Sequence, residues 1–183
     1  MVSYIGFTPQ KNASYAVQYQ EAFEFMFNNR KNAKKESKLV DLPLLYLLRH
    51  YLELSFKYNI EYFKNYSGKS DYLTKLNDTH KIDFLYEAFK LHFDESFKKV
   101  TVEKDLRIQI NDYFVELRKL VDTLSKLDND GVSFKYSDDK NGVENIDSEQ
   151  KIDLIEEIAK PYKNSKDLLD YSINVYKDIL GIK

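Results

Sequence analysis

Apolar residues recur every three or four positions along most of this 183-residue chain. That spacing puts them on one face of an α-helix, so the pattern predicts a bundle of helices. The pattern is strongest between Leu42 and Phe63, where leucine and aromatic residues cover two adjoining helical faces. A helix with such a wide apolar surface needs neighbours on most sides, and we expect the rest of the chain to pack around it.

Helix-capping residues and prolines mark where further helices begin. We expect these helices over about Pro9–Lys31, Thr79–Phe93, Thr101–Leu127 and from Asp147 or Ser148 to Leu180. Pro161 lies inside the last region and is expected to kink or divide it. The total is five or six helices, and we expect the first, the central and the fourth to supply most of the core.

The hydrophobic period changes from helical to alternating after Asp128. Between residues 131 and 146, two turn-like segments flank Val132–Ser137, in which apolar and polar residues alternate. Alternation over a few residues is typical of a short strand. We therefore expect a small β-hairpin insertion on the surface of one all-α domain that spans residues 1–183.

Composition supports a folded domain and narrows the possible partners. Hydrophobic residues make up 43% of the chain, and only five Gly and three Pro interrupt it, which argues for helices over sheet or disorder. The net charge is -2, so nucleic-acid binding would need a local basic patch. The basic segment Arg30–Lys38 is either a solvated helix end that complements the helix dipole or a phosphate-contacting patch.

Several kinds of chemistry lack the residues that they need. The chain has no cysteine, which excludes disulfides and thiolate ligands. Its three histidines form no His-x-x-x-His or Glu-x-x-His cluster, so we expect neither a metal nor a cofactor. The first residues lack a secretory signal, and the apolar run Leu42–Leu48 is too short to cross a bilayer. We expect a cytoplasmic protein that makes no membrane contact.

One narrow polar stripe interrupts the apolar faces of the central helix. Arg49, Glu53 and Lys57 follow one another at four-residue spacing, with His50 beside them, so their side chains are neighbours on a helix. This stripe is the first candidate for a functional site. The alternative is a partly buried ion-pair ladder that fixes how the helices pack, with His50 as a hydrogen-bonded neighbour.

Three segments together resemble a known family. They are residues 48–57 (LRHYLELSFK), 80–86 (HKIDFLY) and 134–142 (FKYSDDKNG). In order and approximate spacing they resemble the Leu-Arg-His-x-x-Glu-Leu-x-x-Lys helix, the Gly-His-Asp-Leu-x-x-Leu-Tyr element and the Phe-Arg-Tyr-Pro-x-Asp-Lys-x-Gly turn of bacterial HEPN-like proteins. The resemblance covers roughly residues 10–180. It implies a helical bundle, a homodimer with a groove between the subunits, and an RNA-directed or nucleotide-binding role in bacterial defence or a toxin-antitoxin system.

The departures from the family pattern bear on the activity. Thr79 stands in place of the glycine and Lys81 in place of the aspartate of the second segment, while Lys135 and Ser137 replace the Arg and Pro of the third. HEPN ribonucleases carry an Arg followed four to six residues later by a His, and no Arg in this chain has a His at that distance. The resemblance therefore implies the fold more directly than catalysis.

A metal-independent ribonuclease needs a base for the ribose 2′-hydroxyl and a cation for the phosphate. His50 and His80 are the candidate bases, because an imidazole titrates near neutrality. Arg49 is the candidate cation, oriented by Glu53 one turn later. The candidate RNA contacts are Lys57, Lys135 and Lys140.

His80 and His92 also have purely structural interpretations, and the chain has a second candidate function. His80 also fits the start of the third helix, and His92 fits a helix end where a cation complements the dipole. The chain is therefore either an RNA-directed protein, with or without ribonuclease activity, or a catalytically inert helical module. The inert module would bind a protein partner, for example a nucleotidyltransferase.

Overall fold

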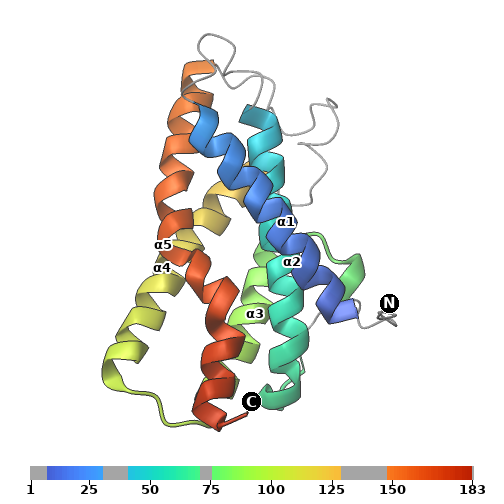
Figure 1. The fold of residues 1–183 in the computed structure, drawn as a ribbon, viewed down its shortest axis with the longest axis vertical. Coiled ribbons are helices and arrows are strands. Elements are labelled where there is room, and N and C mark those ends of the chain that lie inside the picture. The colour runs from blue at the N-terminus through green and yellow to red at the C-terminus, as the bar shows by residue number, and fades with distance from the viewer. Residues whose placement is uncertain (1–7, 31–40, 71–75, 129–147, 183) are drawn as a thin grey trace.

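The computed structural model describes residues 8–30, 41–70, 76–128 and 148–182. Their helices are α1 (Thr8–Asn29), α2 (Asp41–Ser67), α3 (Ile82–Phe97), α4 (Lys104–Asp128) and α5 (Ser148–Leu180), with the short 3-10 helix η2 (Leu76–Asp78) before α3 (Figure 1). These described ranges contain no strand. The prediction of an all-α bundle is confirmed, whereas the hairpin predicted over 131–146 lies outside the described residues.

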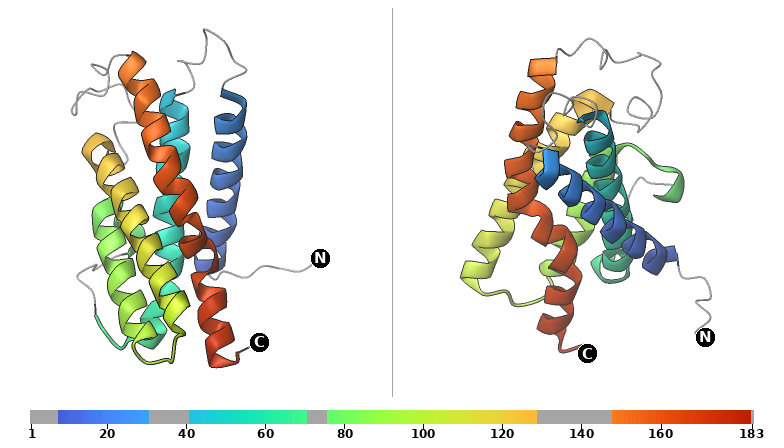
Figure 2. Two further views of the ribbon diagram at one scale, coloured as in Figure 1. Left: turned by 90° about the vertical axis from the view of Figure 1, so that its left-hand side faces the viewer. Right: turned by 45° about the horizontal axis from the view of Figure 1, so that its top comes forward.

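Helix α2 is the centre of the bundle, as its two apolar faces predicted. It packs against α1, α3 and α5, while α4 packs mainly along α5. The helices follow the long axis of the molecule, and α1 crosses the outer side of α2 obliquely (Figures 1 and 2). Every residue from 51 to 57 of α2 is buried, so the middle of this helix is enclosed on all sides.

The core is distributed differently from the sequence-based expectation. Helices α3 and α5 each bury a long row of aliphatic and aromatic side chains, whereas α1 contributes only Ala16 and Phe23 among its described residues. The prediction that the first helix is a main source of the core was wrong. The reason is that α1 covers one side of α2 with one face only. The opposite face of α1 is exposed to solvent and includes Phe25, which is 71% exposed.

Helix α5 continues through Pro161, so of the two predicted outcomes, a kink or a division, the division does not occur. A proline in a helix interior removes one backbone hydrogen bond. Here the neighbouring turns are held by the core, since Ile158 and Tyr162 are both buried. Ser165 Oγ also donates to the Pro161 carbonyl at 2.7 Å.

Helix α3 begins at Ile82, three residues later than predicted. Thr79 instead closes η2, because its N–H donates to the Leu76 carbonyl at 3.2 Å. His80 therefore lies in the connection between η2 and α3.

No helix in the described ranges combines the length and apolar character that crossing a membrane requires.

Candidate functional site

Arg49 lies in the middle of α2 with only 2% of its surface exposed. Its Nε donates to the backbone carbonyl of Asp128 at 2.9 Å, and its Nη2 donates to the backbone carbonyl of His80. Its Nη1 donates to Glu53 Oε2 at 2.8 Å. A planar guanidinium can make such divergent bonds at once, so Arg49 connects α2 to the end of α4 and to the segment before α3.

Glu53 lies one turn beyond Arg49 and is held by three polar groups. Its Oε2 accepts from Arg49, and its Oε1 accepts from Lys57 Nζ and lies 2.8 Å from His80 Nδ1. Burial raises the pKa of Glu53, but hydrogen bonds and charges from Lys57 and Arg49 outweigh it and lower the pKa from 4.5 to about 2. Glu53 is therefore ionised at neutral pH.

His80 is the member of this network that reaches the surface, since 55% of its side chain is exposed. An ionised carboxylate only accepts hydrogen bonds, so the His80 Nδ1 facing Glu53 must carry a proton. In the neutral ring, Nε2 then holds the lone pair. A buried carboxylate that fixes one nitrogen of an exposed imidazole is an arrangement suited to a general base.

An exposed cation and an exposed aromatic ring follow His80 within four residues of the sequence. Lys81 is exposed, and its Nζ lies 5.1 Å from the centroid of the Phe84 ring. Phe84 is 42% exposed. The Asp83 carboxylate is turned to the backbone, where it accepts from the Phe84 N–H at 2.8 Å. Lys81 and Phe84 therefore offer a phosphate contact and a stacking surface.

The second candidate base, His50, has different surroundings. Its ring lies 4.4 Å from the Tyr19 ring in an edge contact and 5.6 Å from the Tyr46 ring in a stacked one. His50 thus contributes to the packing of α1 on α2. The structure brings Arg49, Glu53, Lys57 and His80 together, whereas the ring contacts of His50 are with Tyr19 and Tyr46.

The remaining predicted residues differ in where they lie. Lys57 is 4% exposed and donates to Glu53 at 2.8 Å, so it is a buried partner of that carboxylate. Lys135 and Lys140 lie outside the described residues, as does the basic segment predicted after Arg30. His92, predicted to complement the dipole near the end of the third helix, is fully buried, and its Nδ1 lies 2.8 Å from Ser67 Oγ.

The sequence analysis missed two acidic residues, Asp128 within the network and Glu61 near its Lys57 end. Asp128 is fully buried, and its carboxylate lies 3.8 Å from Arg49 Nε. Glu61 continues the four-residue spacing beyond Lys57, so the sequence did carry that signal. Its Oε2 is buried without a hydrogen-bond partner in the described structure, and burial raises the pKa of Glu61. Nothing in the sequence pattern indicated Asp128.

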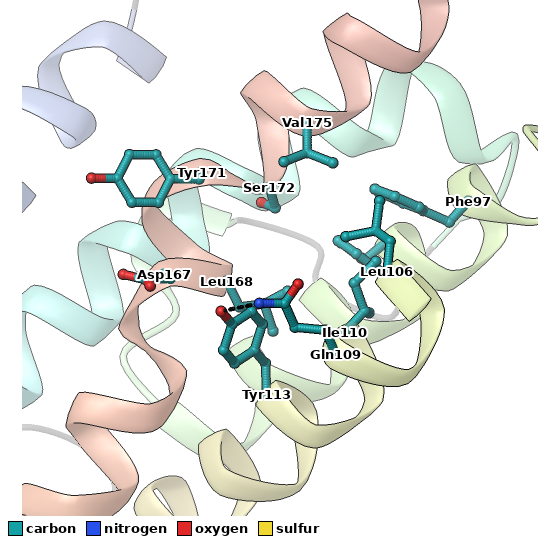
Figure 3. A pocket seen from close by; sticks show the side chains of 11 residues that line it. Phe97, Leu106, Gln109, Ile110, Tyr113, Asp167, Leu168, Tyr171, Ser172 and Val175 are labelled. Atoms are coloured by element: carbon teal, nitrogen blue, oxygen red, sulfur yellow. Dashed lines mark hydrogen bonds between the residues drawn. The ribbon is translucent and has the colours of Figure 1, made fainter. Parts of the chain in front are cut away.

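A separate apolar cleft of about 200 Å³ lies between α3, α4 and α5 (Figure 3). Its described walls include Phe97, Ile110 and Leu168, and Gln109 Nε2 donates to the Tyr113 hydroxyl at 2.8 Å along one side. No residue of the Arg49 network appears among these walls. This cleft offers apolar contact and lacks an imidazole, so it is not the better candidate for acid-base chemistry.

Within the described ranges, no three His, Asp or Glu side chains gather as a set of metal ligands. No family model, curated protein or solved structure matches the chain. The HEPN-like resemblance therefore stays a prediction carried by its three segments.

Proposed function

We propose that this chain is a HEPN-like, RNA-directed protein that acts as a metal-independent ribonuclease in bacterial defence or in a toxin-antitoxin system. The observation that carries the proposal is the exposed imidazole of His80, whose Nδ1 lies 2.8 Å from the buried, ionised carboxylate of Glu53. The three HEPN-like segments support the RNA-directed role, since two of them supply these two residues.

His80 is the general base of the proposed reaction. Its Nε2 takes the proton of a ribose 2′-hydroxyl, and the 2′-oxygen attacks the adjacent phosphorus. The bond from phosphorus to the 5′-oxygen breaks, and the leaving oxygen takes a proton from water. The products are a 2′,3′-cyclic phosphate and a 5′-hydroxyl end. Glu53 stabilises the imidazolium that forms when Nε2 is protonated.

Arg49 and Lys57 take positioning roles in this proposal. Both side chains are buried, so they hold Glu53 ionised and oriented instead of contacting phosphate. The positive charge near the phosphate comes from Lys81, which is exposed beside the base, and Phe84 offers its ring to a neighbouring nucleobase. This assignment replaces the sequence-based choice of Arg49 as the cation.

The test is cleavage of a mixed RNA pool by purified protein in excess chelator. Wild-type protein is expected to leave 2′,3′-cyclic phosphate ends, and His80→Ala is expected to lose at least about 100-fold in rate, as is typical for a missing general base. Free imidazole should restore part of the His80→Ala rate. His50→Phe is the matched control, because it removes a histidine but keeps a ring against Tyr19 and Tyr46.

Lys81→Ala sharpens the same test. It removes the exposed cation without touching the buried network, so a loss of about tenfold with unchanged helicity is expected. Equal cleavage by wild type and His80→Ala would overturn the role of His80. Equal loss in His50→Phe and His80→Ala would overturn the assignment of His80 as the specific base, and circular dichroism of both variants would show whether folding is the cause.

A catalytically inert helical module is the second candidate, because most of the polar network is buried. Arg49, Glu53 and Lys57 each have no more than 4% of their surface exposed, as in an ion-pair ladder that only fixes helix packing. A wild-type protein that folds and leaves every RNA in the pool intact would favour this second candidate and a role in binding a protein partner.

We include a homodimer in the proposal, because HEPN-like proteins commonly pair through their helices. Light scattering during size-exclusion chromatography should give twice the chain mass of 21.7 kDa. A single-chain mass across a hundredfold range of concentration would remove the dimer from the proposal and leave the role of His80 to be judged by cleavage.

A further inference from the structure

A second cleft, of about 680 Å³, lies between the end of α1 and the first half of α5. Figure 1 shows these two segments side by side at the upper left of the bundle. The described lining of this cleft includes Phe27, Asn28 and Arg30 from the end of α1, with Lys160, Lys163 and Asn164 from α5. The volume falls in the range of small-molecule sites, which is about 300 to 1,000 Å³.

The described lining of this cleft is positively charged. Arg30, Lys160 and Lys163 supply three cations against one carboxylate, that of Glu156. Lys160 and Lys163 are three residues apart on α5, so they lie on the same face of that helix. Both are exposed, which leaves their ammonium groups within reach of a ligand from solvent. A phosphate is the common anion that such paired cations bind.

The cleft also contains groups that recognise a flat ring. Phe27 is partly buried and stacks on the core residue Phe23 with 5.8 Å between ring centroids, so its position is fixed. Asn28 and Asn164 lie on the two sides of the cleft and are exposed. An amide side chain donates and accepts hydrogen bonds, and an aromatic ring stacks on any nucleobase.

We propose that this cleft binds a free nucleoside phosphate, with its base against Phe27 and its phosphate at Lys160 and Lys163. The apolar cleft in Figure 3 is a useful contrast, because its volume is about 200 Å³ and no lysine or arginine appears among its described walls. None of the described lining residues of the α1–α5 cleft belongs to the His80 network, so the proposal does not depend on ribonuclease activity.

Titration calorimetry tests this site with AMP, GMP, CMP and UMP, and with adenosine and inorganic phosphate alone. At least one mononucleotide is expected to bind at least tenfold more tightly than adenosine or phosphate. The variant Lys160→Gln, Lys163→Gln is expected to weaken that binding at least tenfold. The control Lys11→Gln, Lys104→Gln removes the same charge from exposed positions outside the cleft and should bind like wild type.

Three results would overturn the proposal. They are no binding of any mononucleotide to wild type, inorganic phosphate binding as tightly as the nucleotides, and an equal loss in the control pair. Phe27→Leu, which keeps an apolar side chain on the core, should weaken nucleotide binding and leave phosphate binding unchanged. His80→Ala should bind nucleotide normally, so a failure here is distinguishable from a failure of the ribonuclease proposal.

Discussion

Helix α2 carries two polar networks on nearly opposite sides, one around a buried carboxylate and the other around a half-buried one. On one side, Glu53 is held by Arg49 and Lys57, and its pKa is lowered to about 2. On the other side, the Tyr51 hydroxyl donates to Asp170 of α5 at 2.7 Å. Tyr51 and Glu53 are two residues apart and therefore point in nearly opposite directions from the helix axis.

The pKa of Asp170 shifts in the opposite direction to that of Glu53, although the Asp170 carboxylate is also well hydrogen-bonded. Gln20 of α1 donates to its second oxygen at 2.9 Å. Burial nevertheless raises the pKa of Asp170, and the hydrogen bonds from Gln20 and Tyr51 do not reverse that effect. The neutral donors thus satisfy the half-buried Asp170 carboxylate geometrically without lowering its pKa, whereas the cations bonded directly to Glu53 keep that carboxylate strongly ionised.

The largest expected effect is that of Glu53→Gln, which leaves Arg49 and Lys57 buried without their carboxylate. Breaking a buried charge pair from one side typically costs about 3 to 5 kcal/mol, and we expect a loss of that size in the free energy of unfolding. Urea denaturation at pH 7 measures it. The exposed Glu21→Gln removes the same charge from α1 and should change stability by less than about 0.5 kcal/mol. Similar losses in both variants would contradict the special role of the Glu53 network.

Acid should reveal the contribution of the Glu53 carboxylate to the free energy of unfolding without a mutation. The pKa of Glu53 is lower in the folded protein than in the unfolded chain, so its contribution is complete above about pH 4.5 and is lost as the pH falls towards 2. A shift from 4.5 to about 2 corresponds to roughly 3 kcal/mol. Urea midpoints between pH 6 and 2 should fall more steeply for wild type than for Glu53→Gln, and parallel curves would contradict this.

Asp170→Asn tests the other network, and we expect a smaller effect. The raised pKa of Asp170 means that its ionised form is disfavoured by folding, so a neutral amide of similar shape removes that cost while losing part of the hydrogen bonding. The two effects oppose each other, and the net change at pH 7 should be below about 1 kcal/mol. A loss as large as that of Glu53→Gln would erase the contrast between the two sides of α2.

The smallest expected effect on stability is that of His80→Ala. The ring is 55% exposed, and ion pairs at exposed positions contribute about 0 to 1 kcal/mol. Arg49 bonds to the backbone carbonyl of His80, which alanine retains. Thermal unfolding should therefore change little, while the proposed cleavage is lost. A loss above about 2 kcal/mol would identify His80 as a structural clamp instead.

The sequence predicted the bundle because apolar periodicity reports directly on helices and on the faces they bury. The four-residue spacing likewise predicted that Arg49, Glu53 and Lys57 would be neighbours. The spacing could not predict that these three residues are buried, nor that they contact His80, which lies 27 positions from Glu53. Such contacts depend on where α3 and α4 begin and end against α2, and helix ends are the least regular part of a hydrophobic pattern.

The roles of the histidines show the same limit. His50 adjoins Arg49 in the sequence but faces Tyr19 and Tyr46, because consecutive residues point about 100° apart on a helix. His92 was predicted to complement a helix dipole, yet it is buried against Ser67 at the end of α2. In both cases the partner comes from another helix or another turn, which local spacing does not show.

The most direct test of the account is the position of the proton on the His80 ring, because it requires no knowledge of the substrate. A long-range ¹H–¹⁵N NMR spectrum of the side chains, with His80 assigned through His80→Ala, distinguishes the two neutral forms. We predict the proton on Nδ1, facing Glu53, with Nε2 unprotonated. A neutral ring protonated on Nε2 would contradict it, since Glu53 would then not orient a base.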